Sequence, residues 1–214
     1  MRVIVIGGSG FVGSKIVNEL VERGHSVKTI VRHANKVENP AVEVVEKDVL
    51  KDPITNELTG ADVVVSAYNA GWSNPNIYED FIRGSETIQR AVEQSGVKRY
   101  IVIGGAGSLL DAQGNQLVDA TDFPAHIKPG ATAARDYFHI LKQNDTLDWT
   151  FFSPAIEMHP GTSGVRKGVY RTGLDHPVFD VNGRCVLSVE DLAVCITDEV
   201  EHPKHIRKRF TAAY

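Results

Sequence analysis

Cysteine is scarce in this sequence, and its scarcity excludes disulfide-stapled and zinc-binding folds. Only Cys185 and Cys195 occur among the 214 residues. Two cysteines cannot build a disulfide framework, and no zinc-type spacing of Cys and His surrounds them. We expect two free, buried thiols and predict no metal site.

Long apolar runs and a surplus of positive charge are also missing. No stretch approaches the ~20 apolar residues of a membrane span, and the opening apolar run is too short for a signal peptide. The formal net charge is −4, whereas phosphate contacts demand an excess of Lys and Arg. We expect a cytoplasmic protein, monomeric or homodimeric, with neither a membrane nor a nucleic acid as partner.

Apolar runs alternate with helical patterns along most of the chain. The runs typical of buried strands are residues 3–6, 27–31, 42–45, 61–66, 99–103 and 149–153. Apolar residues at helical spacing occupy residues 11–23, 77–94 and 131–142. Strands separated by crossover helices pair in parallel. The order therefore predicts an α/β fold with a doubly wound parallel sheet, the Rossmann fold.

The pattern changes after the sixth strand. Residues 154–185 are rich in Gly, Pro, His and Arg and show no sustained period. A helical pattern returns over 188–201, and a last short strand is expected at 209–214. We predict a single domain over residues 1–214, with residues 154–185 as a small irregular insertion on the substrate side.

A glycine-rich loop joins the first strand to the first helix, in the run Gly7-Gly8-Ser9-Gly10-Phe11-Val12-Gly13. The first glycine of such a loop permits a tight turn, the second lets the backbone approach a pyrophosphate, and the third lets the helix pack closely. The helix N-terminus adds free amides and partial positive charge. We predict dinucleotide binding by Gly7, Ser9, Gly10, Phe11, Val12 and Gly13; the alternative is a plain glycine-rich turn.

The end of the second strand indicates which dinucleotide binds. An NAD site places Asp or Glu there for the ribose hydroxyl, but no carboxylate occurs between Val31 and Lys36. The guanidinium of Arg32 can pair with a 2′-phosphate, and Lys36 adds charge. We predict NADP(H) as the cofactor, with NAD(H) as the alternative.

Three stretches carry a family resemblance: the glycine loop, the step Lys47-Asp48-Val49, and the run from Tyr100 to Ala106. Together they resemble the atypical short-chain dehydrogenase/reductase superfamily. The chain is similar to its small NAD(P)H-binding group, which includes NmrA-like and biliverdin reductase B-like proteins and is often labelled NAD-dependent epimerase/dehydratase. The likeness covers nearly the whole chain, including residues 188–193 and 209–214.

The resemblance assigns further cofactor contacts. It implies that Asp48 and Val49 lie by the adenine and that Ala67 and Tyr68 flank the ribose. It also implies that Gly104, Gly105 and Ala106 pass near the nicotinamide.

The catalytic pair of the superfamily, a tyrosine with a lysine four residues later, is absent. Tyr137 is followed by Lys142, a spacing that leaves the two on poorly matched faces of a helix. If Asp136 matches the family's acidic residue, the tyrosine and lysine positions fall on Lys128 and Thr132. We expect Tyr137 to be a packing aromatic with a solvated hydroxyl.

Other side chains are candidates for catalysis. The superfamily has a serine or threonine near the end of the fifth strand that binds the substrate carbonyl, which makes Ser108 the first candidate; a capping serine is the alternative. His126 and His159 fall in irregular segments and could donate a proton, although a surface or loop histidine is the commoner role for each. A histidine found in biliverdin reductase-like members corresponds here to Ile156.

Two regions could shape an acceptor pocket. The aromatic loop at residues 68–75 could form one wall, or be a surface loop with a packed tryptophan. Arg166, Lys167 and Arg171 could give the insertion a basic edge.

These features predict an oxidoreductase that transfers hydride from NADPH to a small acceptor, either a quinone, a flavin or a carbonyl compound. One alternative is a non-catalytic NADP(H)-sensing regulator of the NmrA-like type, which the missing pair favours. The other, a sugar-nucleotide epimerase or dehydratase, is weakened by the missing pair and by the short C-terminal part.

Overall fold

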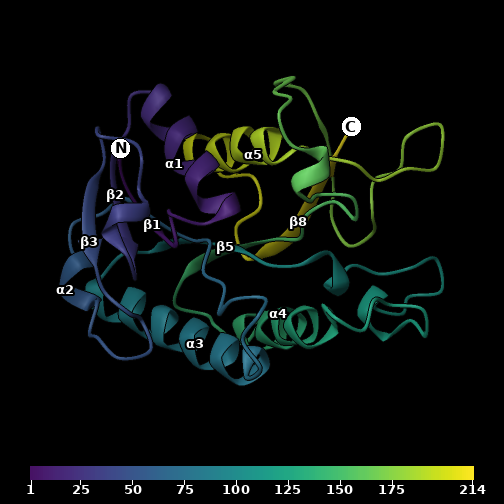
Figure 1. Cartoon of the computed structure of the whole chain (residues 1–214), viewed down its shortest axis with the longest axis horizontal. Coiled ribbons are helices and arrows are strands. Elements are labelled where there is room, and N and C mark those ends of the chain that lie inside the picture. The colour runs from purple at the N-terminus through teal and green to yellow at the C-terminus, as the bar shows by residue number, and fades with distance from the viewer.

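A single eight-stranded sheet runs through the molecule (Figure 1). The computed structural model describes residues 1–214. Its strands follow the order β3-β2-β1-β4-β5-β6-β8-β7. They are β1 (Arg2–Ile6), β2 (Ser26–Val31), β3 (Glu43–Glu46), β4 (Val63–Ser66), β5 (Arg99–Ile103), β6 (Asp148–Phe152), β7 (Arg171–Gly173) and β8 (Lys208–Ala213). All neighbouring pairs are parallel except β7 with β8, so the predicted doubly wound sheet is confirmed.

Helices cover both faces of this sheet. They are α1 (Phe11–Glu22), α2 (Thr55–Leu58), α3 (Ile77–Ser95), α4 (Lys128–Leu141) and α5 (Val189–Glu201). Figure 1 shows α1 and α5 on one face and α3 and α4 on the other. Four short 3₁₀ helices lie in the loops: η1 (Ala34–Lys36), η2 (Ala106–Ser108), η3 (Leu117–Asp119) and η4 (Pro160–Thr162). None of the helices is long and apolar enough to cross a membrane.

The first strand shows why the sheet needs two covering layers. Successive side chains of a strand point to opposite faces. Val3 and Val5 pack with the residues of α1 and α5, whereas Ile4 and Ile6 pack with those of α3 and α4. All four are fully buried, which explains the continuous apolar run in the sequence.

The structure corrects the predicted elements at a few points. Helix α4 begins at Lys128 rather than Ala131, and α2 was not predicted. Part of the irregular segment 154–185 joins the sheet, because β7 pairs antiparallel with β8. A strand of three residues is too short to show a pattern of alternating apolar side chains in the sequence. Strand β7 can therefore be recognised only from its pairing with β8. Both cysteines are free and buried, as expected.

A buried ion pair fastens α5 to the amino end of the sheet. Arg99 Nη2 of β5 donates to Glu199 Oε1 of α5 over 2.7 Å, and the Glu199 side chain is only 3% exposed. Arg99 Nη1 also donates to Thr150 Oγ1 of β6, over 2.7 Å. Burial alone would raise the pKa of Glu199, but hydrogen bonds from His205 and Lys204 and the nearby Arg99 charge hold it below its ordinary value.

This ion pair predicts a pH-dependent loss of stability. Glu199→Gln should lower the free energy of unfolding by about 3 kcal/mol near neutral pH, because it leaves the buried Arg99 without its paired carboxylate. A lowered carboxyl pKa stabilises the fold above its unfolded value of 4.5, and this contribution is lost as the pH falls through the folded pKa. Urea unfolding at pH 7 and at several acidic pH values measures both effects.

The matched control is Glu157→Gln, which removes a half-exposed carboxylate paired with the exposed Arg184. It should change the free energy of unfolding far less than Glu199→Gln does, because an exposed ion pair contributes little to stability. Equal losses for the two variants would contradict the role assigned to Glu199.

Candidate functional site

The carboxyl ends of five neighbouring strands form one edge of the sheet. Between β1 and β4 the strand order reverses, and this is the place where open α/β sheets bind ligands. Every residue predicted to contact the cofactor follows one of these strand ends: Gly7, Ser9, Gly10, Phe11, Val12 and Gly13 after β1, Arg32 after β2, Asp48 and Val49 after β3, Ala67 and Tyr68 after β4, and Gly104, Gly105 and Ala106 after β5. The fold therefore brings the predicted set to a single edge.

Three positions in the glycine loop have no room for a side chain. Gly7 has a φ of +87°, and a Cβ there would lie 2.6 Å from the carbonyl oxygen of Ala67. A Cβ on Gly13 would lie 2.2 Å from the carbonyl oxygen of Gly7, and one on Gly8 would lie 2.2 Å from Thr29 Oγ1. Backbone is packed against backbone at Gly7 and Gly13, and against buried side chains at Gly8, so a plain surface turn does not explain these glycines.

The first turn of α1 is left open for an anion. Gly10 is its N-cap and offers no side-chain cap, and no acidic residue lies in the first turn. The first helical hydrogen bond runs from the Ser14 amide to the Gly10 carbonyl, over 2.9 Å. The amides of Phe11, Val12 and Gly13 have no acceptor within the protein. Such amides, together with the helix dipole, suit a pyrophosphate.

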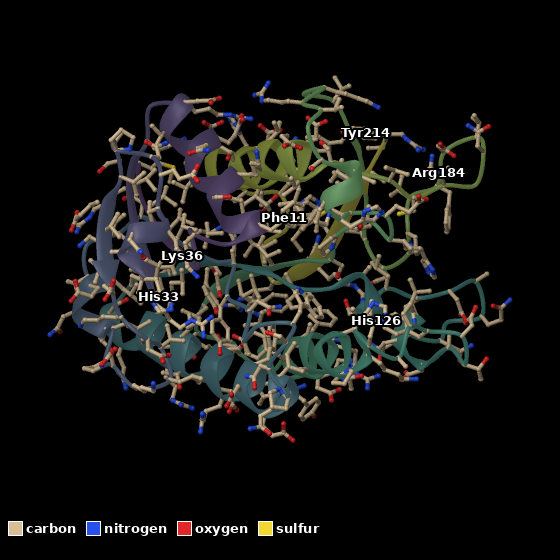
Figure 2. The ribbon with its side chains drawn as sticks, viewed as in Figure 1. Phe11, His33, Lys36, His126, Arg184 and Tyr214 are labelled. Carbon is tan, nitrogen blue, oxygen red and sulfur yellow. The ribbon has the colours of Figure 1, made fainter.

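A polar cavity of about 470 Å³ lies beyond the ends of β2 and β3. It is lined by Arg32, His33, Glu46, Lys47, Asp48, Lys51 and Asp52. Figure 2 shows His33 and Lys36 on this side of the molecule, with Phe11 nearer its centre.

The cations of this cavity differ in their partners. Lys47 Nζ pairs with Glu57 over 3.1 Å and Lys51 Nζ with Asp48 over 3.4 Å. The guanidinium of Arg32 is exposed and makes neither an ion pair nor a hydrogen bond within the protein. An uncommitted guanidinium is suited to bind a phosphate.

Tyr68 is fixed in place beside the glycine loop. Its hydroxyl donates to the Asp80 carbonyl over 2.9 Å, and its ring occupies the space that a Cβ on Gly84 would need. Burial, followed by the charge of Asp80, raises its pKa to about 12. Tyr68 is therefore a neutral, rigid wall and not an acid or base near neutral pH.

The loop after β5 crosses the first turns of α4. A Cβ on Gly104 would lie 2.0 Å from Phe151 Cζ, so the chain passes directly over that ring. A Cβ on Gly105 would lie 3.6 Å from Ala134 of α4, and one on Gly107 would lie 3.4 Å from Ala131. The β5 loop and the start of α4 are thus packed against each other at this edge.

The two hydroxyl groups considered for catalysis are buried. Ser108 is 0% exposed; its Oγ donates to the Gly105 carbonyl over 3.0 Å and lies 2.9 Å from Ser153 Oγ. No face of this hydroxyl is open to a substrate, and its catalytic role stays a prediction that the packing disfavours. The expectation of a solvated hydroxyl on Tyr137 is wrong.

Tyr137 points into the core between α3 and α4. Its hydroxyl donates to Gln89 Oε1 over 3.1 Å and lies 3.4 Å from the Tyr100 hydroxyl. Burial raises its pKa well above the ordinary value. The phenol is therefore a structural group, held by a long-range contact with α3 that the local sequence does not encode.

The two candidate histidines are exposed and lie in different segments. His126 precedes α4, as Figure 2 shows, and makes no hydrogen bond within the protein. His159 caps η4, where its Nδ1 accepts from the Gly161 amide over 3.1 Å. That bond leaves Nε2 free. The structure does not bring either histidine into contact with the glycine loop.

Comparison with known proteins adds to this geometry. Residues 7–203, which include the glycine loop, match the family described as NAD(P)H-binding. The chain belongs to this NAD(P)H-binding family. Membership of the atypical short-chain dehydrogenase/reductases, expected from the sequence, is thereby confirmed. A nicotinamide cofactor suits the glycine loop and the open amides of α1 described above.

Relatives of this NAD(P)H-binding protein span its full length. The uncharacterized Bacillus subtilis protein YwnB is 35% identical over 213 residues, or 99% of this chain and 97% of the relative. A Bacteroides thetaiotaomicron structure provisionally named an epimerase is 42% identical, with a TM-score of 0.90 over 100% of this chain and 96% of its own. A Streptococcus pneumoniae structure provisionally named an NADH-flavin reductase is 32% identical, with a TM-score of 0.85 over 100% and 99% of the two chains.

Sequence reasoning missed two supports of this NAD(P)H-binding site. Thr29 of β2 accepts a hydrogen bond from the Gly8 amide (3.2 Å) and donates to the Val5 carbonyl (2.8 Å), so it braces the glycine loop from the next strand. A buried threonine inside a strand carries no signal of this role. Lys47 directly follows β3 and lines the same cavity as Arg32, but no part in the cofactor site was predicted for it.

The close packing at Gly13 predicts that a single methyl group added there hinders cofactor binding. Gly13→Ala should weaken NADPH binding at least tenfold, because the new Cβ would collide with the Gly7 backbone and force α1 away from the loop. It should also cost about 1–3 kcal/mol of stability, as overpacking does. Titration of NADPH fluorescence and urea unfolding measure the two effects.

Gly24→Ala is the matched control. Gly24 also follows a helix turn, with a φ of +81° and nothing within 4 Å of a Cβ. The substitution should cost about 1 kcal/mol of backbone strain and leave NADPH binding unchanged. Full NADPH affinity in Gly13→Ala would contradict this role of Gly13.

Proposed function

We propose that this chain is an NADP(H)-dependent oxidoreductase that reduces a small acceptor. The observation that carries the cofactor choice is Arg32, an exposed guanidinium without a partner at the end of β2. No carboxylate occupies the position where an NAD site has Asp or Glu. The preference for NADP(H) over NAD(H) rests on this charge pattern.

The residues at the carboxyl ends of the strands would contact successive parts of the cofactor, from the 2′-phosphate to the nicotinamide. Arg32 would bind the 2′-phosphate, with Asp48 and Val49 beside the adenine and Ala67 and Tyr68 beside the ribose. The amides of Phe11, Val12 and Gly13 would bind the pyrophosphate. Gly104, Gly105 and Ala106 would lie along the nicotinamide. When bound, the reduced nicotinamide supplies a hydride, that is, two electrons and a proton.

The lack of an available hydroxyl proton donor at this edge narrows the class of acceptor. Both Ser108 and Tyr137 have their hydroxyls engaged in the core, so neither is available to donate a proton. An oxidised flavin or quinone accepts a hydride and takes its second proton from water, so it needs no protein acid. The provisional name of the Streptococcus pneumoniae relative supports a flavin, although that name pairs the flavin with NADH.

The cofactor choice is tested by Arg32→Ala. NADPH affinity should fall about tenfold or more, because the only uncommitted guanidinium in the cavity is lost, while NADH affinity should stay the same. The measurement is a fluorescence titration of the purified protein with each dinucleotide. The control Arg90→Ala removes an exposed arginine of α3 whose one side-chain hydrogen bond is to Thr87, and it should change neither affinity.

An equal loss of NADPH and NADH binding in Arg32→Ala would contradict a 2′-phosphate contact. Equal affinity of the unaltered protein for both dinucleotides would also remove Arg32 from the proposal.

The acceptor chemistry is tested by Tyr137→Phe. Because the hydroxyl is buried against Gln89 and Tyr100, its removal should leave the rate of FMN reduction by NADPH within about threefold. The variant should lose about 1 kcal/mol of stability, the net value of a typical hydrogen bond. A rate loss of a hundredfold or more with retained NADPH binding would show instead that the phenol takes part in proton transfer.

A second function, a regulator that senses NADP(H) without turnover, is favoured by the same buried hydroxyls. The two functions differ in their use of the two redox forms. A sensor should bind NADPH and NADP⁺ with clearly different affinities and reduce no acceptor, whereas a reductase should oxidise NADPH in the presence of a flavin or quinone.

A further inference from the structure

Two large aromatic side chains at the cofactor edge are exposed, Phe11 at 39% and Trp72, which is the more open of the two. Trp72 is 61% exposed. By contrast, the other tryptophan, Trp149, is 4% exposed and packs edge-on against Phe138, with 6.3 Å between the ring centroids. Burying an indole contributes strongly to stability, so an exposed one at a ligand-binding edge needs a reason.

The loop that carries Trp72 is held rigidly. Asn69 Oδ1 accepts from the Gly71 amide over 2.7 Å, and Asn74 Oδ1 accepts from the Asn76 amide over 2.9 Å. Asn74 Nδ2 donates to Asp80 Oδ2 over 2.9 Å, which fastens the loop to the first turn of α3. The indole is thus presented by a braced loop, and its exposure does not come from a loose end.

The indole rests on a glycine of α4. A Cβ on Gly130 would lie 2.8 Å from Trp72 Cζ3, so the six-membered ring lies directly against the helix backbone. Gly130 is buried in the first turn of α4. A glycine here lets the ring lie close to the helix, with the rest of the indole open to a ligand.

This contact puts Trp72 on the same helix turns as the β5 loop. Ala131 lies by Gly107 and Ala134 by Gly105, and Gly130 lies by Trp72. Gly130 and Ala134 are four residues apart and therefore lie on the same face of α4, so the indole and the β5 loop contact neighbouring positions of one helix. The β5 loop is where the proposed function puts the nicotinamide.

We propose that Trp72, backed by Gly130, is the stacking platform that selects a planar aromatic acceptor at this edge. The proposal rests on the proposed oxidoreductase function and adds the acceptor class: a fused aromatic ring system such as a flavin, in preference to an aliphatic carbonyl compound. An indole face attracts planar π-systems regardless of their substituents, and Trp72 is the most exposed aromatic side chain of the chain.

The test measures binding without turnover. FMN is titrated into protein saturated with NADP⁺, which cannot reduce it, and the anisotropy of FMN fluorescence gives its dissociation constant. Trp72→Ala should weaken FMN binding about tenfold, on the scale that stacking on an aromatic side chain provides. Trp72→Phe should retain binding within about threefold, since a smaller aromatic face remains.

Two controls separate the platform from the cofactor site. Ile206→Ala removes an exposed apolar side chain next to the amino end of β8, at the opposite edge, and should leave FMN binding unchanged. NADPH affinity, followed by its own fluorescence, should stay within twofold in all three variants.

The outcomes are distinguishable. FMN binding that is unchanged in Trp72→Ala, or absent from the unaltered protein, overturns the proposed role of Trp72. The proposed function itself is not contradicted in that case, provided that the protein binds NADPH. Absence of NADPH binding from the unaltered protein defeats the proposed function itself. A tenfold loss confined to Trp72→Ala, with binding retained by Trp72→Phe, supports the platform.

Discussion

The close approach of two backbone segments, at Gly7 and Gly13, governs the architecture of the whole edge. A single added carbon on Gly13 would lie 2.2 Å from the Gly7 carbonyl oxygen, so α1 can begin where it does only with glycine at that position. The same loop touches the end of β4 through Ala67 and is braced from β2 by Thr29. Residues of β1, β2 and the segment after β4 therefore all contact one loop, and the open amides of α1 follow that loop directly. The cavity beside Arg32 and the β5 loop extend this edge to either side.

Much of the fold could be predicted because it rests on local periodicity. Strand β1 reads as a continuous apolar run since α1 and α5 cover one of its faces and α3 and α4 the other. The carboxyl-edge location of the site follows from strand order alone, so the cofactor residues could be proposed without coordinates. By contrast, β7 depends on pairing with β8, and α2 is a single turn. The surroundings of the Ser108 and Tyr137 hydroxyls depend on Ser153, Gln89 and Tyr100, which are distant in sequence. No local pattern reports such contacts.

The site combines a well-built cofactor cradle with little acid–base chemistry. Its phenols are neutral: burial raises the pKa of Tyr68 to about 12 and that of Tyr137 well above its ordinary value. Its two candidate histidines lie at the surface in separate segments. This division fits a protein in which the cofactor carries the redox chemistry and the chain supplies binding and orientation. It also explains how relatives with one fold can bear names as different as epimerase and flavin reductase, because fold alone does not set the reaction.

The two outermost strands of the sheet, β3 and β7, are both short and carry charged side chains. On one side β3 is a four-residue strand with a glutamate at each end, Glu43 and Glu46, and both are exposed. On the other side β7 has three residues and begins with the exposed Arg171. Short, charged edge strands resist pairing with the edge of another sheet. The molecule is thus protected against aggregation through its sheet, and any self-association has to use helix or loop surfaces.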